Sequence, residues 1–126
     1  MDNDTETVKQ EPDRTLYGKV IGIVRTRSEL KSLCDSLAIL GVREVEVLNG
    51  DSGTKRLETW KETVSQYFFG DMEGEMLQRY LAAVANDLFV FAAAVAPELA
   101  DKSAEIAKMQ GASDIVHFGN SAVTNY

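Results

Sequence analysis

Few residues in this chain have the side-chain chemistry of an active site. The 126-residue sequence contains one histidine, His117, and one cysteine, Cys34. An imidazole can carry a proton near neutral pH or bind a metal ion, and a thiolate can act as a nucleophile. A metal site needs several ligands at suitable spacing, and the chain offers no second histidine or cysteine. We therefore predict no catalytic residue, no metal and no cofactor.

The segment from Asn49 to Lys55 is the candidate site for a small ligand. It is rich in turn-forming residues and lies between a predicted strand and a predicted helix, where backbone amides can bind an anion. It lacks the spacing of a nucleotide phosphate loop, and Asp51 would repel a phosphate. A turn that caps the helix is the favoured interpretation. The candidate ligand residues are Asn49, Ser52, Gly53, Thr54 and Lys55.

The densest aromatic group lies on the next predicted helix, over residues 54–69. Its members are Trp60, Tyr67, Phe68 and Phe69. Aromatic residues bury large apolar areas in cores and in interfaces between subunits. We predict that these four belong to the core or to a subunit interface, and we name them as candidate interface residues.

The sequence contains two similar strand–helix–strand halves, and these must position the candidate residues. Val20–Val24 and Leu88–Val95 are almost continuously apolar, which is typical of inner strands buried on both faces. Each is followed by a helix with a periodic apolar stripe, a glycine and a second strand, at 43–48 and at 114–118. The pattern predicts an α+β fold, namely a ferredoxin-like split βαβ sandwich with a four-stranded antiparallel sheet in the order 4-1-3-2.

The domain organisation follows from this pattern. We expect a disordered acidic tail over residues 1–16, a single domain over 17–118 and a C-terminal polar tail over 119–126. A helical insert, 54–86, separates the two halves of the domain.

The second face of the predicted sheet is the main open question. The inner strands are apolar on both faces, and two helices would cover only one of them. Either the helical insert or another subunit must cover the other face, because a large exposed apolar surface is unusual on a monomer. We favour a homodimer that packs sheet to sheet.

The composition disfavours two classes of partner. The chain has 20 acidic and 13 basic residues and a net charge of −7, whereas nucleic-acid binders usually present a basic face. The longest apolar run, Leu88–Ala96, is too short to span a bilayer as a helix. With one cysteine, no intrachain disulfide can form, which fits a reducing compartment. We predict a cytoplasmic protein that binds neither nucleic acid nor membrane.

Both halves resemble a known family. Lys19–Val24, Gly41-Val42 and Val45–Leu48 in the first half, and Arg79-Tyr80-Leu81, the strand 88–95 and Gly111–Ile115 in the second, are similar to small bacterial general stress proteins of the 17M-like, heat-induced type. The resemblance covers residues 19–118. It implies a ferredoxin-like α+β domain and supplies no catalytic residues, and the aromatic segment 54–69 departs from it.

Three functions remain open at this point. The favoured one is a non-catalytic, dimer-forming, stress-associated module that acts through protein contacts. The alternative is a regulatory domain that binds a small ligand at residues 49–55. The third is a small dimeric α+β-barrel enzyme that uses His117 with Arg25 or Tyr80, which requires these side chains to converge in a pocket.

Overall fold

A five-stranded antiparallel sheet forms the middle layer of the molecule. The computed structural model describes residues 16–67, 71–119 and 122–126, and the statements below concern this part of the chain. Every pair of neighbouring strands is antiparallel. The strands, in their order across the sheet, are β2 (Val45–Leu48), β3 (Phe89–Ala94), β1 (Lys19–Val24), β4 (Ser113–Phe118) and β5 (Val123–Asn125).

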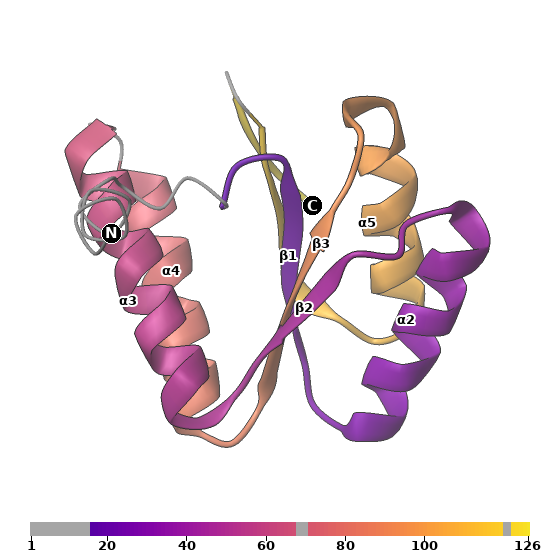
Figure 1. Cartoon of the computed structure of the whole chain (residues 1–126), viewed down its shortest axis with the longest axis horizontal. Helices are drawn as coiled ribbons and strands as arrows, with labels where there is room; N and C mark the ends of the chain where they lie inside the picture. The colour runs from indigo at the N-terminus through magenta and orange to yellow at the C-terminus, as the bar shows by residue number, and fades with distance from the viewer. Residues whose placement is uncertain (1–15, 68–70, 120–121) are drawn as a thin grey trace, which may run out of the picture.

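Helices cover both faces of this sheet, so the fold is a three-layer α+β sandwich. Figure 1 shows the sheet almost edge-on, with α3 and α4 on one side and α2 and α5 on the other. The helices are α2 (Arg27–Leu40), α3 (Gly50–Tyr67), α4 (Asp71–Ala85) and α5 (Ala100–Met109), and a short 3-10 turn, η1 (Pro97–Leu99), leads into α5.

The inner strands β1 and β3 are buried on both faces, as the sequence predicted. Ile21, Ile23, Val90 and Ala92 pack in one cluster with residues of α3 and α4. Val20, Val24, Phe91 and Ala93 pack in a second cluster with residues of α2 and α5. Alternate side chains of a strand point to opposite faces, and here each face has its own core.

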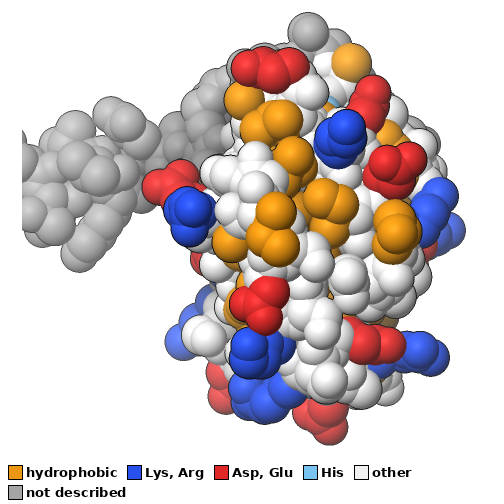
Figure 2. Space-filling model, turned by 90° about the vertical axis from the view of Figure 1, so that its right-hand side faces the viewer, with side chains coloured by type: hydrophobic (Ala, Val, Ile, Leu, Met, Phe, Trp, Pro, Cys, Tyr) orange, Lys and Arg blue, Asp and Glu red, His pale blue; other side chains and the backbone are white. Residues whose placement is uncertain are grey.

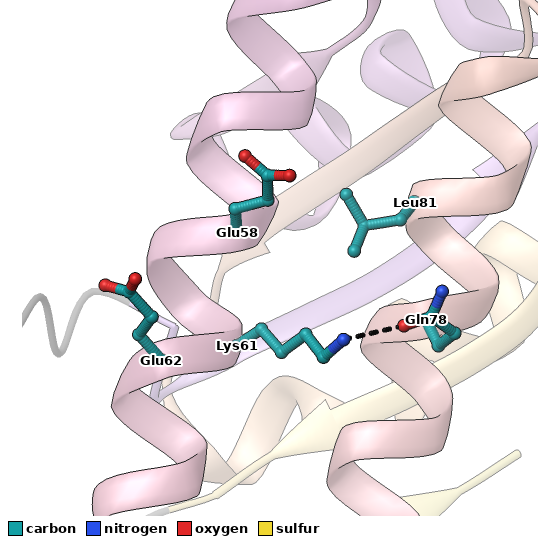
Figure 3. A pocket seen from close by; sticks show the side chains of 5 residues that line it. All are labelled: Glu58, Lys61, Glu62, Gln78 and Leu81. Carbon is teal, nitrogen blue, oxygen red and sulfur yellow. Dashed lines mark hydrogen bonds between the residues drawn. The ribbon is translucent and has the colours of Figure 1, made fainter.

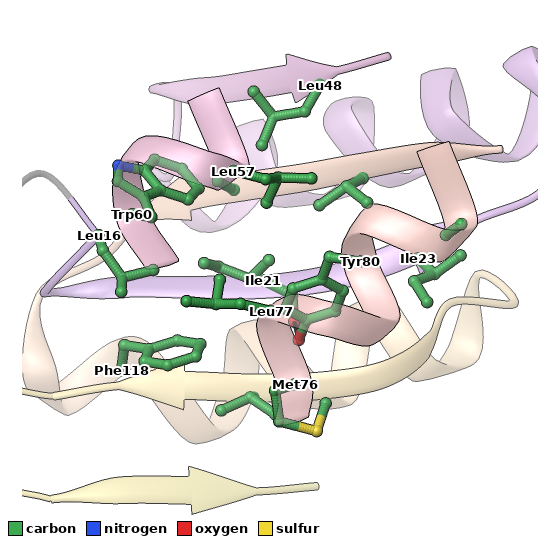
Figure 4. Packing of buried hydrophobic residues seen from close by; sticks show 14 of the residues in the cluster. Leu16, Ile21, Ile23, Leu48, Leu57, Trp60, Met76, Leu77, Tyr80 and Phe118 are labelled. Atoms are coloured by element: carbon green, nitrogen blue, oxygen red, sulfur yellow. Dashed lines mark hydrogen bonds between the residues drawn. The ribbon is translucent and has the colours of Figure 1, made fainter. Parts of the chain in front are cut away.

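The second face of the sheet is covered by the chain itself. Leu57 and Trp60 from α3, with Leu77 and Tyr80 from α4, lie fully buried over Ile21 (Figure 4). This corrects the expectation that two subunits pack sheet to sheet, because no sheet face is left for such a contact. The physical reason is that α3 and α4 each carry an apolar stripe that can be buried locally.

Several boundaries differ from the predicted ones. The sheet has five strands instead of four, and β5 lies within the predicted tail 119–126, where the Tyr126 amide donates to the Ile115 carbonyl oxygen at 2.9 Å. Leu16, which we assigned to the N-terminal tail, is fully buried in the core below α3 and α4. The rest of that predicted tail lies outside the described residues.

A β-bulge interrupts the pairing of β1 with β4. Ile21 pairs with Val116 but Ile23 pairs with Ser113, so β4 has one extra residue opposite Gly22. Asp114, at this point, has a positive φ of 49°. A Cβ atom on Gly22 would lie 2.7 Å from Cε2 of Phe91, so only glycine leaves room for this ring against β1.

Candidate functional site

The predicted ligand loop is the start of a helix. Asn49 directly precedes α3, and Ser52, Gly53, Thr54 and Lys55 lie within its first two turns. The prediction of a turn that precedes the helix in this segment was therefore wrong, because the helix already begins at Gly50. Gly53 explains the error, because a Cβ atom there would lie 2.8 Å from the backbone carbon of Leu48. The glycine thus permits close packing of α3 on the end of β2, which a sequence pattern does not distinguish from a turn.

The polar side chains of this segment do not converge on a common point. The Thr54 hydroxyl donates to the Gly50 carbonyl oxygen at 3.1 Å, within its own helix. Asn49, Ser52 and Lys55 are exposed. The described contacts are those of the start of a helix.

Of the four candidate interface residues, only Trp60 can be placed. Trp60 is fully buried in the core, so it cannot contact another subunit directly. The guanidinium of Arg56 stacks over the Trp60 ring at 5.0 Å and donates to the Glu46 carboxylate at 2.9 and 3.3 Å. Tyr67 ends α3, and its side chain lies outside the described part of the chain, as do Phe68 and Phe69.

The three residues of the enzyme hypothesis do not converge either. His117 pairs with Val20 and faces α2 and α5, whereas Tyr80 packs with Ile21 on the opposite face of the sheet. Arg25 follows the far end of β1, about five residues or roughly 16 Å along the strand from Val20. The structure therefore does not bring His117 together with Arg25 or Tyr80, which the enzyme hypothesis requires.

Asp101 on α5 is a charged neighbour of His117. Burial lowers the pKa of His117, and the carboxylate of Asp101 on α5 acts in the opposite direction. The Tyr126 hydroxyl donates a hydrogen bond to Asp101 Oδ1 at 2.5 Å. Burial, followed by this hydrogen bond and the Asp101 charge, raises the pKa of Tyr126 to about 12. A tyrosine with such a pKa stays neutral at physiological pH and serves here to attach the end of the chain to α5.

A shallow groove of about 320 Å3 lies beside this contact. Its lining consists of Asp101, Ala104, Glu105, Lys108 and Tyr126. A larger open groove, of about 630 Å3, runs between the outer sides of α3 and α4, and Figure 3 shows its lining residues Glu58, Lys61, Glu62, Gln78 and Leu81. Within it, Lys61 Nζ donates to Gln78 Oε1 at 2.8 Å and so links the two helices.

Cys34 is half-buried on α2 among residues of the second core. Burial raises the pKa of its thiol, and the adjacent Asp35 carboxylate raises it further. Both effects reduce the thiolate population, so the setting is that of a structural cysteine and is unfavourable to a nucleophile.

The exposed hydrophobic side chains are concentrated on one side of the molecule. Among the described residues, the large ones are Ile39 on α2, Met109 on α5 and Val47 on β2, with exposed fractions of 90, 79 and 40%. Val47 pairs with Phe91, so its side chain points to the α2 and α5 side as well. We call these three residues the apolar side. In Figure 2, hydrophobic side chains gather over the upper part of this face, and charged ones crowd its lower end.

The sequence contained a signal for this surface that we did not use. Ile39 lies outside the stripe of buried leucines at 30, 33 and 37, so an apolar residue was present on the solvent side of a helix. Met109 likewise lies outside the buried positions of α5.

Comparison of the chain with protein-family models, with curated proteins and with solved structures found no match. Within the described residues, no group of three or more histidine, cysteine, aspartate or glutamate side chains is arranged to hold a metal ion. None of the helices in this part of the chain is long and apolar enough to cross a membrane.

Proposed function

We propose that this chain is a non-catalytic, dimer-forming module that acts through protein contacts, and that the apolar side carries these contacts. The observation behind the proposal is that Ile39, Met109 and Val47 are exposed on the same side of the sheet. Single exposed hydrophobic residues are common on any protein, but those gathered on one face mark interaction surfaces.

The fold supports a more specific classification. The strand order β4-β1-β3-β2 is contained in the observed sheet, with β5 added beside β4 and the α3–α4 pair inserted between the halves. We propose a ferredoxin-like split βαβ domain with these two additions. A relation to small general stress proteins rests on the sequence resemblance alone, and a cytoplasmic location rests on the single cysteine, which fits a reducing compartment.

Sedimentation over a range of concentrations tests the proposal. The chain has a mass of 13.9 kDa, and we expect the weight-average mass to rise toward twice this value at about 10–100 μM, as for a micromolar dissociation constant. Replacing Ile39, Met109 and Val47 together by serine should lower the association while leaving the circular dichroism spectrum unchanged, because all three side chains are exposed.

A matched variant controls for surface changes in general. Glu58, Glu75 and Ala82 are exposed on α3 and α4, on the other side of the sheet, and their replacement by serine should leave the mass unchanged. A wild-type chain that stays monomeric throughout this range would remove the proposal.

The groove between α3 and α4 favours a second candidate, a regulatory domain that binds a small ligand. Its carboxylates, Glu58 and Glu62, suit a ligand that carries an amine. A thermal-shift screen of polyamines and basic amino acids tests this candidate, with Glu58→Gln as the variant that should lose any stabilisation. A flat response to all of them would eliminate it.

A further inference from the structure

Within the described residues, no strand pairs with the outer edge of β2, so the backbone groups that point there have no strand partner. The Ala94 amide donates to the Glu44 carbonyl oxygen at 2.9 Å, and Val45 pairs with Ala93. In an antiparallel ladder, alternate residues of a strand bond to the same neighbour. Glu44, Glu46 and Leu48 therefore bond toward β3, and the amides and carbonyls of Val45 and Val47 point away from the sheet. Figure 1 shows β2 crossing in front of the other strands.

This edge lacks the features that usually block pairing with another chain. Natural edge strands are often protected by lysine, by proline or by a bulge. Val45–Leu48 contains neither lysine nor proline, and its pairing with β3 is regular. Its one charged residue, Glu46, forms an ion pair with Arg56 at 2.9 Å. Val47 is 40% exposed beside the free edge.

We propose that two copies of this chain pair through antiparallel β2 strands about a twofold axis at Val47, so that one sheet continues across both copies. The inference rests on the proposed function and places the contact at Val47, the residue of the apolar side that lies on this edge. The outward groups of Val47 then bond to those of Val47 in the second copy. Glu46 lies opposite Leu48 of that copy, on the side of α3 and α4.

Charges select this register over its neighbour. A shift of the axis to Glu46 would place Glu46 opposite its own copy, and like charges directly opposite each other destabilise a strand pair. With the axis at Val47, Glu46 lies opposite the apolar Leu48 of the second copy, so no like charges meet within the paired strands.

A charge exchange at Val47 tests the axis directly, because a residue on a twofold axis meets its own copy. Val47→Lys alone and Val47→Glu alone should each weaken dimerisation by about tenfold or more, since like charges meet. An equimolar mixture of the two variants should recover the dimer mass in sedimentation, because lysine then meets glutamate. With the axis at Glu46, residue 47 would face Val45, and the mixture would not recover.

Two further variants make the test independent of folding effects. Val47→Pro removes an amide that points away from β3, so it should abolish dimerisation while the fold remains intact by circular dichroism. Thr124→Lys adds the same charge on β5, at the opposite edge of the sheet, and should leave the dimer unchanged. Dimers that persist in Val47→Pro and in both charge variants would overturn the inference while the proposed function stands. A wild-type chain that stays monomeric would overturn both the inference and the proposed function. If the equimolar mixture of Val47→Lys and Val47→Glu did not recover the dimer mass, the axis at Val47 would be refuted.

Discussion

The hydroxyl of Tyr80 on α4 donates a hydrogen bond to the main-chain carbonyl oxygen of Asp114 at 2.7 Å and lies 3.3 Å from that of Ile21. The ring thus reaches from the helix layer into the β-bulge between β1 and β4. Arg79, the preceding residue, donates to the Asp114 carboxylate at 2.8 Å. Burial raises the pKa of Tyr80 far above its usual value, so the hydroxyl remains a donor at any physiological pH. These contacts fix the position of α4 on the sheet.

The Tyr80→Phe variant should therefore lose stability without losing its core packing. It leaves the Asp114 carbonyl oxygen without its side-chain donor, and such a loss costs about 1–3 kcal/mol in the free energy of unfolding. Urea denaturation measures this difference. Tyr126→Phe removes a hydroxyl that bonds to the exposed Asp101 and should cost less than about 1 kcal/mol. Equal effects of the two substitutions would contradict the role that we assign to Tyr80.

Two glycines should respond in opposite directions to replacement by alanine. In Gly22→Ala the new Cβ would lie 2.7 Å from Phe91 Cε2 and 3.2 Å from Ile115 Cγ1, and such overpacking costs about 1–3 kcal/mol. In Gly74→Ala the new Cβ, on α4, meets no atom within 4 Å. That change should stabilise the protein by about 0.5–1 kcal/mol, because glycine is a poor helix former. Thermal unfolding of both variants measures the contrast, and a stabilised Gly22→Ala would disprove the close approach of Phe91.

The parts of the fold that could be predicted are those whose burial is evident from the local spacing of apolar residues. The continuous apolar runs at 20–24 and 88–95 identified the inner strands because only strands shielded on both faces tolerate them. The stripes on α3 and α4 showed that each helix must bury one face. They did not show which surface covers that face, because an amphipathic stripe carries no information about its partner, and we wrongly chose a second subunit.

Other elements lacked a local signal altogether. β5 has three residues, two of them polar and exposed, and it forms only because it pairs with β4. The bulge at Asp114 arises from the mismatch of two strands far apart in sequence. At residues 49–53 the turn-forming residue types led to a wrong prediction. Gly53 permits close packing of α3 on the end of β2 and does not form a turn. The apolar side could be detected in the sequence only from hydrophobic residues that lie outside the buried stripe of a helix. Ile39 on α2 is an example.

Because the sequence contains a single histidine, the effect of histidine protonation on stability can be assigned to His117 alone. Burial lowers the pKa of His117 in the folded chain, and the Asp101 carboxylate only partly opposes this effect. The folded state therefore binds this proton less tightly than the unfolded chain, whose histidine pKa is about 6.5. Protonation thus favours unfolding. The contribution of neutral His117 to the free energy of unfolding is complete above about pH 6.5. It is lost as the pH falls through the lower pKa that this histidine has in the folded state.

We accordingly expect the free energy of unfolding to be constant from about pH 8 to pH 7 and to decrease between about pH 6.5 and pH 5, before most carboxylates titrate. In His117→Gln this decrease should be reduced, since glutamine does not titrate. Urea denaturation at several pH values measures both curves. The imidazole resonance in a proton NMR titration gives the folded-state pKa directly, because no other histidine contributes. A folded-state value at or above 6.5 would show that Asp101 outweighs burial and would reverse the sign of the expected dependence.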